Sequence, residues 1–418
     1  MLLLPNVTAE MLDPAFWLAR LDDPDAPILD ADGVRALNAH VLETLNLLEP
    51  LDLPDALLAQ TVRGFMTPID KAETCYDVSG ARYPAAAWEA LRANMAVDAI
   101  PTEARVRWGL VTRRTNLRAF PTQALGMSQP GQFFFDRFQA TTVDVGWPAA
   151  VVHTSADRRW RFALTPMYWG WIEAAHVALA DGRETVRRYV DAEPFVMAVA
   201  PQASVAMPDG RHALAQMGTR LPVAGREAGA LRVSIPRRDG AGRLAVADGY
   251  IARDDAAWRE GYLPCTLRTV FSQAFALLGE GYAWGGTRAG LFGRDCSRLV
   301  RDVWAVTGLR LPRNSRQQGR VGVTVARFDP DDPPAVRAAV LAERAPPGAL
   351  LLLPGHVMIY LGAVDGVPYA IHDLWNYNHP DGRVTIAASV VVTDLPTAPS
   401  AQRNTLLERL THVQVIGL

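Results

Sequence analysis

Two short stretches decide the fold of the last part of the chain: Tyr282-Ala-Trp-Gly-Gly286 and Arg294-Asp-Cys-Ser-Arg-Leu-Val300. The apolar residues after them repeat at the spacing of one helical face: Leu299, Val300, Val303 and Trp304. Gly308 supplies a C-terminal stop, so Cys296 is predicted in the first turn of a buried helix. Backbone N–H groups and the helix dipole favour a thiolate there, and the glycines upstream let a loop approach the sulfur.

Asp295 works against an ionised sulfur, because a carboxylate beside a thiolate raises the pKa of the thiol. The conflict eases if Asp295 points into a pocket and holds a cationic group of a substrate. We therefore expect Asp295 to be a binding residue.

A cysteine nucleophile needs a base, and the base needs an orienting group. His356 begins a predicted strand over 356–361, directly after a Pro-Gly turn, and the next predicted strand, 368–375, contains His372. If residues 364–366 form the loop between them, Met358 pairs with His372 and the two histidines lie diagonally on one face. A two-residue Asp-Gly turn would put them on opposite faces.

Other chemistries remain to be weighed against a cysteine nucleophile. Cys296 alone would usually be a small buried apolar residue, but that interpretation leaves the glycine loop and the two histidines unexplained. Zinc is an alternative with ligands His356, His372, Asp373 and His379, although the fixed spacings of zinc motifs are missing. A serine hydrolase built on Ser297 lacks the G-x-S-x-G elbow.

The rest of the 418-residue chain reads as several smaller parts. Apolar spacings predict helices in the first hundred residues, and two β-rich segments with Gly and Pro punctuation then predict two small barrels. The apolar run 349–364 is about as long as a short membrane span, but Pro354-Gly355-His356 breaks it, so two strands around a turn explain it better. Three cysteines are too few for a disulfide scaffold, and Cys75 and Cys265 have no surroundings like those of Cys296.

These motifs resemble the NlpC-type family of bacterial cell-wall cysteine peptidases, which have a compact papain-like fold. The resemblance covers the Tyr282-x-Trp-Gly-Gly loop, Asp295-Cys296-Ser297 and the Gly-His-Val strand start at 355–357. It implies Cys296 as nucleophile, His356 as general base and His372 as the residue that orients it. It also implies that Tyr282 helps to stabilise the oxyanion. The chain has Arg298 where the family commonly has Gly, which bears on substrate fit more than on catalysis.

The segment 146–177 likewise resembles a bacterial SH3-like domain. With this resemblance the chain reads as a multidomain α+β protein with four parts: a helical N-terminal unit (1–110), a first SH3-like barrel (111–180), a second SH3-like barrel (181–256) and an NlpC-type papain-like peptidase domain (257–418).

Members with that arrangement resemble γ-D-glutamyl-L-diamino-acid endopeptidases that trim short muropeptides with a free N-terminal L-alanine. The likeness implies that Asp295 and Ser297 hold the α-amine of the substrate, with Ser315 at another substrate-side position. A tyrosine of the first barrel completes the pocket in relatives, and Tyr168 is the candidate here. Blocking such an amine would leave buried polar groups unpaired, so N-acylated stem peptides would be rejected.

Charge and composition bound the partners. The 42 basic and 44 acidic residues give a formal net charge of −2, which creates no global field toward nucleic acid or an anionic membrane. We expect peptidoglycan stem peptides or murein tripeptides as partners, no transmembrane segment, no cofactor or metal, and a monomer. The location is expected to be the cell envelope if a leader has been removed, and otherwise the cytoplasm.

Two other functions stay open at this stage. A wall-binding protein could use the barrels to hold glycan or stem peptide while the peptidase fold is idle. A papain-like amidase or acyltransferase would use the same cysteine with a different acyl donor.

Overall fold

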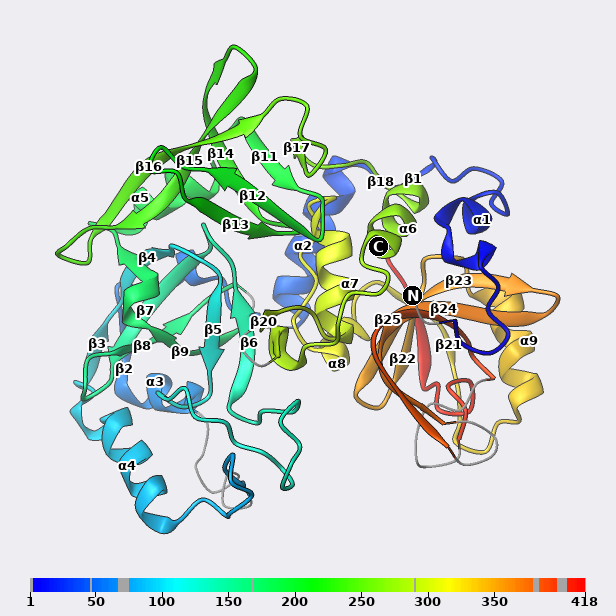
Figure 1. Cartoon of the computed structure of the whole chain (residues 1–418), viewed down its shortest axis with the longest axis horizontal. Helices are drawn as coiled ribbons and strands as arrows, with labels where there is room; N and C mark the ends of the chain where they lie inside the picture. Colours follow the sequence, from blue (N-terminus) through cyan, green and yellow to red (C-terminus); the bar gives the residue numbers. More distant parts are fainter. Residues whose placement is uncertain are drawn as a thin grey trace. The chain divides into compact units, whose positions relative to one another are not determined.

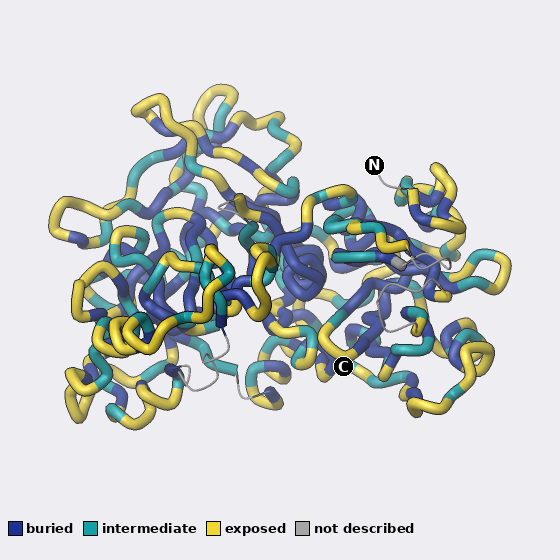
Figure 2. The backbone as a smooth tube through the Cα atoms, turned by 60° about the horizontal axis from the view of Figure 1, so that its bottom comes forward, coloured by how far each residue is buried: buried dark blue, intermediate teal, exposed yellow. Residues whose placement is uncertain are grey.

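A computed structural model describes residues 3–45, 47–66, 75–166, 168–288, 291–378, 383–396 and 404–417. The contacts within the chain divide it into two compact units (Figure 1). We call residues 1–47, 262–283 and 293–418 the terminal unit, and residues 48–261 and 284–292 the central unit. In Figure 2, buried stretches lie mainly in the interior and exposed stretches mainly at the periphery of the tube.

The terminal unit is built on one six-stranded antiparallel sheet with strand order β21-β26-β22-β23-β24-β25. Its strands are β21 (Val323–Arg327), β22 (Leu350–Leu353), β23 (His356–Val364), β24 (Val367–Asn378), β25 (Val384–Asp394) and β26 (His412–Val415). All four leucines of β22 are buried, as expected for a central strand with both faces covered. The apolar run 349–364 is thus two strands around a turn, as predicted, and no helix among the described residues is long and apolar enough to cross a membrane.

The helices described in this unit are α1 (Pro14–Leu18), α2 (Ala31–Thr44), α6 (Leu267–Ala276), α7 (Cys296–Ala305), α8 (Ser315–Gln318) and α9 (Pro334–Arg344). Three of them, α2, α6 and α7, lie where the apolar spacing predicts helices. Helix α7 packs on β23 and β24, and α9 packs on β21 and β24. Gly308 has a φ of +88° just after α7, in the left-handed region that commonly ends a helix.

The hairpin of β23 and β24 differs from the predicted connection. The loop is the two-residue turn Asp365-Gly366, with φ values of +51° and +80°, because Val364 pairs with Val367. A bulge between Tyr360 and Gly362 then shifts the register by one residue. The short turn and the bulge cancel, so the histidines lie on one face although the predicted three-residue loop is wrong.

The first 47 residues belong to the terminal unit. Strand β1 (Pro27–Leu29) pairs with β18 (Cys265–Thr266), and the Asn38 side chain in α2 donates to the Gly308 carbonyl at 2.9 Å. The helical unit predicted over 1–110 is therefore divided, with 48–110 in the central unit. Apolar periodicity shows which helix face is buried but not which core buries it.

The central unit contains two seven-stranded sheets made from consecutive parts of the chain. The first has β4 (Arg107–Val111), β5 (Thr115–Arg118), β6 (Gln139–Val143), β7 (Pro148–Thr154), β8 (Trp160–Leu164), β9 (Trp169–Glu173) and β10 (Val177–Leu179). The second has β11 (Phe195–Ala198), β12 (Gln202–Ala206), β13 (His212–Gln216), β14 (Arg220–Glu227), β15 (Ala230–Arg238), β16 (Leu244–Ala252) and β17 (Trp258–Glu260). Two β-rich segments were expected here, and their closure into barrels stays a prediction.

Short helices and strand pairs complete the central unit. They are β2 (Ala56–Leu58), α3 (Ala59–Phe65), α4 (Ala85–Met95), β3 (Glu103–Arg105), α5 (Arg183–Val190), β19 (Thr287–Arg288) and β20 (Leu291–Phe292). Trp88 of α4 packs edge-on against Phe120 and Phe138, with ring centroids 5.9 and 5.7 Å apart. Residues 48–110 therefore share one core with the first sheet.

Candidate active site

Cys296 is the first residue of α7, where the sequence predicts it. Asp295 is the N-cap, and its Oδ1 accepts a hydrogen bond from the Arg298 backbone N–H at 3.0 Å. Gln318 donates from its side chain to the carbonyl of Ser297 at 2.8 Å. The first turn of the helix is thus held by the Asp295 cap and by the Gln318 side chain. The Cys296 thiol in this turn is buried.

His356 and His372 form a direct hydrogen bond from neighbouring strands. His356 Nε2 lies 2.8 Å from His372 Nδ1, and His372 Nε2 lies 2.9 Å from Thr393 Oγ1. His372 and Thr393 are both completely buried. Thr393 is a site residue that sequence reasoning missed, since only the pairing of β24 with β25 brings it beside His372.

The start of β23 also reaches the sulfur. The backbone N–H of Val357, the residue after His356, donates a hydrogen bond to the Cys296 thiol. With Nε2 of His356 bonded to His372, Nδ1 is the ring nitrogen left for proton exchange with the thiol. The structure thus brings the three predicted residues into one order along α7, β23 and β24.

Tyr282 is held beside this group by backbone pairing. Its N–H donates to the Ala388 carbonyl in β25 at 2.7 Å, and its ring packs edge-on against Trp375 at 5.6 Å. Burial raises the pKa of the Tyr282 hydroxyl, and a thiolate at Cys296 would raise it further. The phenol therefore stays a proton donor at neutral pH.

The charge state of the resting nucleophile differs from the prediction. Burial, followed by the Asp295 carboxylate, raises the pKa of the Cys296 thiol to about 12. Burial, followed by the positive charge of Arg409, lowers the pKa of His356 to about 4. Burial disfavours the charged form of each group, so both shifts favour a neutral thiol and a neutral imidazole, in contrast to the thiolate that the helix dipole favours.

Asp295 has a partner that the sequence analysis did not assign. Arg313 donates to both of its carboxylate oxygens, at 3.1 and 2.6 Å, and to Ser297 Oγ at 2.8 Å. All three side chains are buried. Asp295 thus already contacts a cation of the chain itself, and the substrate contact assigned to Asp295 and Ser297 stays a prediction.

Arg298 points away from this cluster. Its Nε donates to Asp302 Oδ1 at 2.7 Å, one turn along α7, and Asp302 also accepts from Arg294 at 2.9 Å. Arg294 in turn pairs with Glu280, which precedes the Tyr282 loop. Arg298, where the family commonly has Gly, thus belongs to a buried ion-pair network that ties the loop to the helix.

The remaining predicted binding residues belong to different units of the chain. Ser315 is the half-buried first residue of α8 in the terminal unit. Tyr168 lies in the central unit, where its ring stacks on Trp169 with centroids 5.0 Å apart. The substrate contacts assigned to these two residues stay predictions.

Asp373 is completely buried on β24, next to His372 but on the opposite face of the strand. Neither carboxylate oxygen has a hydrogen-bond partner among the described residues. Burial raises its pKa well above the usual range, and the carboxylates of Asp295 and Glu280 raise it further. We therefore expect Asp373 to be a neutral acid at neutral pH.

The described part of the chain contains no group of three or more His, Cys, Asp or Glu side chains that could hold a metal ion. The fourth ligand of the zinc alternative, His379, lies outside the described residues. Cys75 and Cys265 are free and buried, and burial raises the pKa of each thiol. These two cysteines fit the structural role predicted for them.

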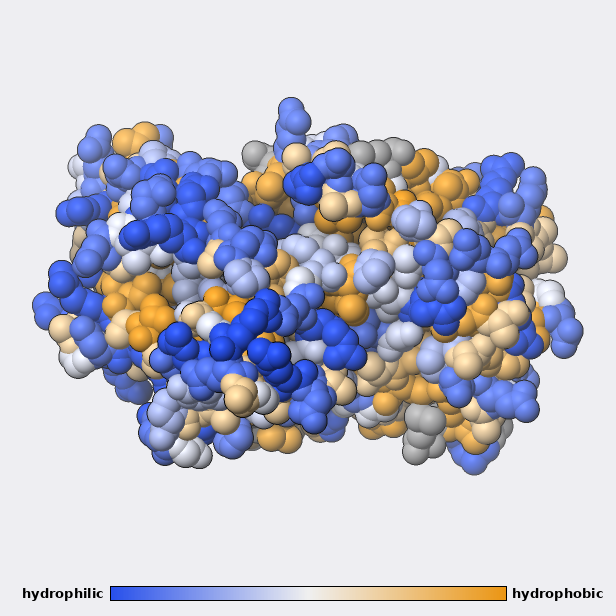
Figure 3. All heavy atoms as spheres, turned by 90° about the horizontal axis from the view of Figure 1, so that it is seen from above, coloured by the Kyte–Doolittle hydropathy of each residue, from blue (hydrophilic) through white to orange (hydrophobic). Residues whose placement is uncertain are grey.

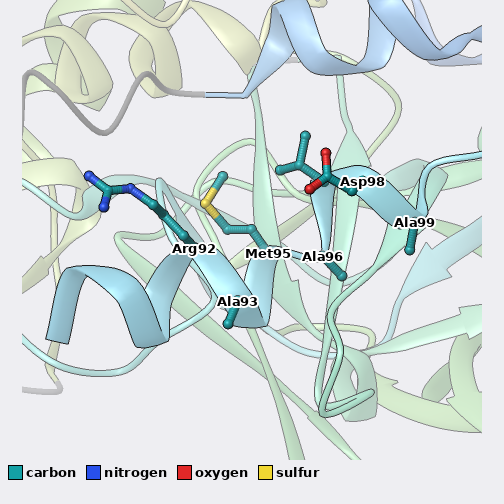
Figure 4. A pocket seen from close by; sticks show the side chains of 7 residues that line it. Arg92, Ala93, Met95, Ala96, Asp98 and Ala99 are labelled. Carbon is teal, nitrogen blue, oxygen red and sulfur yellow. The ribbon is translucent and has the colours of Figure 1, made fainter. Parts of the chain in front are cut away.

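A separate hollow lies at the C-terminal end of α4 (Figure 4). Its walls are three alanines, Met95 and Val97, with Arg92 and Asp98 at the sides. No histidine or cysteine lines it. Its lining therefore offers no nucleophile, and the candidate site remains the group around Cys296.

Two family models match the chain. Residues 279–384 match the NlpC/P60 family, and residues 128–173 match an SH3 domain of the SH3b1 type. The first match contains Tyr282, Cys296, His356 and His372 in the arrangement described above.

This part of the chain is an NlpC/P60 domain.

The resemblance predicted from the motifs is thereby confirmed, and the protein is a multidomain NlpC-type protein with an SH3b domain before the NlpC/P60 domain. The curated relative is the gamma-D-glutamyl-L-lysine dipeptidyl-peptidase of Bacillus cereus, which is 30% identical over 137 residues. That match covers 32% of this chain and 39% of the relative. The chain thus spans about two fifths of the length of the curated relative that it matches.

Solved structures extend the likeness of fold. An NlpC/P60 endopeptidase from Photobacterium damselae subsp. piscicida matches over 96% of both chains with a TM-score of 0.74 and 17% identity. An NlpC/P60 family protein from Bacillus cereus ATCC 10987 matches over 74% of this chain and 100% of its own, with a TM-score of 0.53 and 17% identity. At these identities the likeness shows the fold alone.

Proposed function

We propose that this protein is a cysteine peptidase that hydrolyses the γ-D-glutamyl-L-diamino-acid bond of peptidoglycan-derived peptides. The observation that carries the proposal is the hydrogen-bonded order His356, His372, Thr393 beside Cys296 within an NlpC/P60 domain. The Bacillus cereus relative is named a gamma-D-glutamyl-L-lysine dipeptidyl-peptidase, and this name supports a γ-D-glutamyl bond as the one that is cleaved.

The proposed reaction starts from a neutral pair. The Cys296 sulfur attacks the carbonyl carbon of the γ-D-glutamyl bond while its proton passes to His356 Nδ1. For Nδ1 to accept that proton, His356 Nε2 carries a hydrogen and donates to His372 Nδ1. His372 Nε2 then donates to Thr393 Oγ1, so one set of tautomers satisfies the whole line.

The later steps return the proton. His356 gives it to the nitrogen of the diamino acid as the C–N bond breaks, which leaves a thioester on Cys296. Water, activated by the same imidazole, hydrolyses the thioester and restores the thiol. The protonated phenol of Tyr282 is suited to donate a hydrogen bond to the oxyanion of each tetrahedral intermediate.

A Cys296→Ala variant tests the proposal. With L-Ala-γ-D-Glu-diaminopimelate as substrate, we expect kcat/KM to fall by about 10³-fold or more, because no other group can form the thioester. Cys265→Ala, which removes another buried thiol of the same unit, is the matched control and should keep its activity. Unchanged turnover in Cys296→Ala would refute the proposal, and product masses with water as the only acceptor separate hydrolysis from acyl transfer.

The SH3b domain favours one second candidate, a wall-binding protein whose peptidase fold is idle. Full-length Cys296→Ala protein that still sediments with sacculi, together with a wild type that hydrolyses no peptide, would support it. Location in the cell envelope or the cytoplasm and a monomeric state stay predictions.

A further inference from the structure

In the cluster beside the nucleophile, four donor groups surround the Asp295 carboxylate. Asp295 Oδ1 accepts from the Arg298 backbone N–H at 3.0 Å, from Ser297 Oγ at 3.2 Å and from Arg313 Nη1 at 3.1 Å. Asp295 Oδ2 accepts from Arg313 Nη2 at 2.6 Å. A carboxylate offers about four acceptor positions, so these four donors already fill Asp295.

The charges of Asp295 and Arg313 also balance each other. Asp295 and Arg313 are 6% and 4% exposed, and the guanidinium meets the carboxylate in the two-pronged geometry that makes such pairs strong. An ammonium group brought to Asp295 would place a second buried cation beside Arg313 with no second anion in the pair. Like charges in a poorly solvated site repel, so that arrangement is unfavourable.

Arg313 is held in place by its neighbours in the chain. Gln318 donates from one side-chain nitrogen to both the Ser297 and Pro312 carbonyls, at 2.8 Å each. This side chain is completely buried and ties the segment that carries Arg313 to the first turn of α7. The guanidinium is therefore a fixed part of the site.

We propose that Arg313 is a specificity-determining residue that takes the place of a substrate ammonium at Asp295. The proposal rests on the proposed function. The enzyme then has no requirement for a free N-terminal amine, and its substrates include γ-D-glutamyl peptides whose N-terminal alanine is acylated. This differs from the free-amine substrate that the family resemblance implies.

The test compares L-Ala-γ-D-Glu-diaminopimelate with its N-acetylated form. We expect the wild type to cleave both with kcat/KM values within about threefold of each other. In Arg313→Met the Asp295 charge is left without its cation, so the free amine should become preferred by at least about tenfold, mainly through loss of turnover of the acetylated peptide. Added guanidinium ion should restore the acetylated substrate in that variant.

Arg316→Ala is the matched control. Arg316 is an exposed arginine of the same segment, and no hydrogen bond among the described residues joins its side chain to Asp295, Ser297 or Arg313. This variant should leave the ratio unchanged. A merely structural Arg313 would lower turnover of both peptides equally in Arg313→Met and leave their ratio at the wild-type value.

The outcomes separate the two proposals. A wild type that prefers the free amine by more than tenfold overturns the role of Arg313 while the proposed function stands. A wild type that cleaves neither peptide overturns the proposed function. If Arg313→Met does not fold, the wild-type ratio alone still decides.

Discussion

The two sides of Cys296 handle buried polar groups in opposite ways. On the helix side, Asp295 and Arg313 form a charged pair, and further along α7 Asp302 pairs with Arg294 and Arg298. On the sheet side, His356, His372 and Thr393 form a line in which each partner is neutral. The ion pair of Asp295 and Arg313 stabilises the charge of both groups, so neither readily gains or loses a proton. The neutral histidines can accept a proton and return it. We infer that the helix side sets the fit of the substrate and that the sheet side moves the proton.

The sharpest test of the neutral sheet side is the reactivity of the thiol. Since the pKa of Cys296 is raised to about 12, its thiolate fraction should grow tenfold for each pH unit. We expect alkylation of Cys296 by iodoacetamide to speed up about 100-fold between pH 7 and pH 9, with no plateau in that range. Peptide mapping by mass spectrometry measures it at each cysteine separately.

The unfolded chain supplies the control, since in denaturant the three thiols should titrate near the ordinary value of about 8.5. A fast, pH-independent rate for Cys296 between pH 5 and pH 8 would mean a preformed thiolate–imidazolium pair. That result would contradict the neutral resting state and restore the thiolate expected from the helix dipole.

Thr393 tests whether the end of the neutral line matters. Thr393→Val keeps the shape of the side chain but leaves the buried His372 Nε2–H without an acceptor. We expect kcat/KM to fall about tenfold, with a loss of roughly 1–3 kcal/mol in the free energy of unfolding. The pH profile should change in the same variant, because the orientation and tautomer of His372 are no longer fixed.

Thr393→Ser keeps the hydroxyl and should behave nearly as the wild type. Equal losses of activity in the Ser and Val variants would show that the methyl packing of Thr393 matters and that its hydrogen bond does not.

The smallest expected effect concerns Asp373, the buried acid that belongs to neither side. Its pKa is raised in the folded protein, so as pH rises through the ordinary range the unfolded chain ionises first and the folded state loses stability. Asp373→Asn removes this ionisation. We expect the variant to unfold at a higher temperature than the wild type at pH 8, and the difference between the two unfolding temperatures to shrink toward pH 4.

Asp365→Asn makes the same substitution at an exposed side chain in the turn of the same hairpin, so it is the matched control and should change the unfolding temperature little. A gap for Asp373→Asn that stays constant from pH 4 to pH 8 would mean that Asp373 is ionised in the folded protein.

The candidate site shows how far local patterns reach. The start of α7 at Cys296 follows from an N-cap residue, an apolar stripe and a terminal glycine, all within about fifteen residues, and the structure agrees. The connection between β23 and β24 does not follow from local patterns. A two-residue turn and a bulge at Tyr360–Gly362 each shift the register, and only the two shifts together put His356 beside His372. Apolar alternation alone does not reveal such a pair of compensating shifts.

The distribution of hydrophilic and hydrophobic residues on the surface does not indicate where the site lies. Hydrophilic and hydrophobic residues are interspersed on the face drawn in Figure 3, and the 42 basic and 44 acidic residues nearly balance. The groups that matter around Cys296 are buried, so overall charge excludes classes of partner but does not identify a ligand.

The sequence by itself determined the nucleophile at a helix start, the two histidines on neighbouring strands and the family to which residues 279–384 belong. The tertiary structure alone decided that the thiol rests neutral, that Arg313 meets Asp295 and that Thr393 closes the histidine line. The physical reason is the range of the forces involved. Helix caps and turns depend on residues a few positions apart, whereas desolvation and ion pairing depend on whichever distant segments fold against a group.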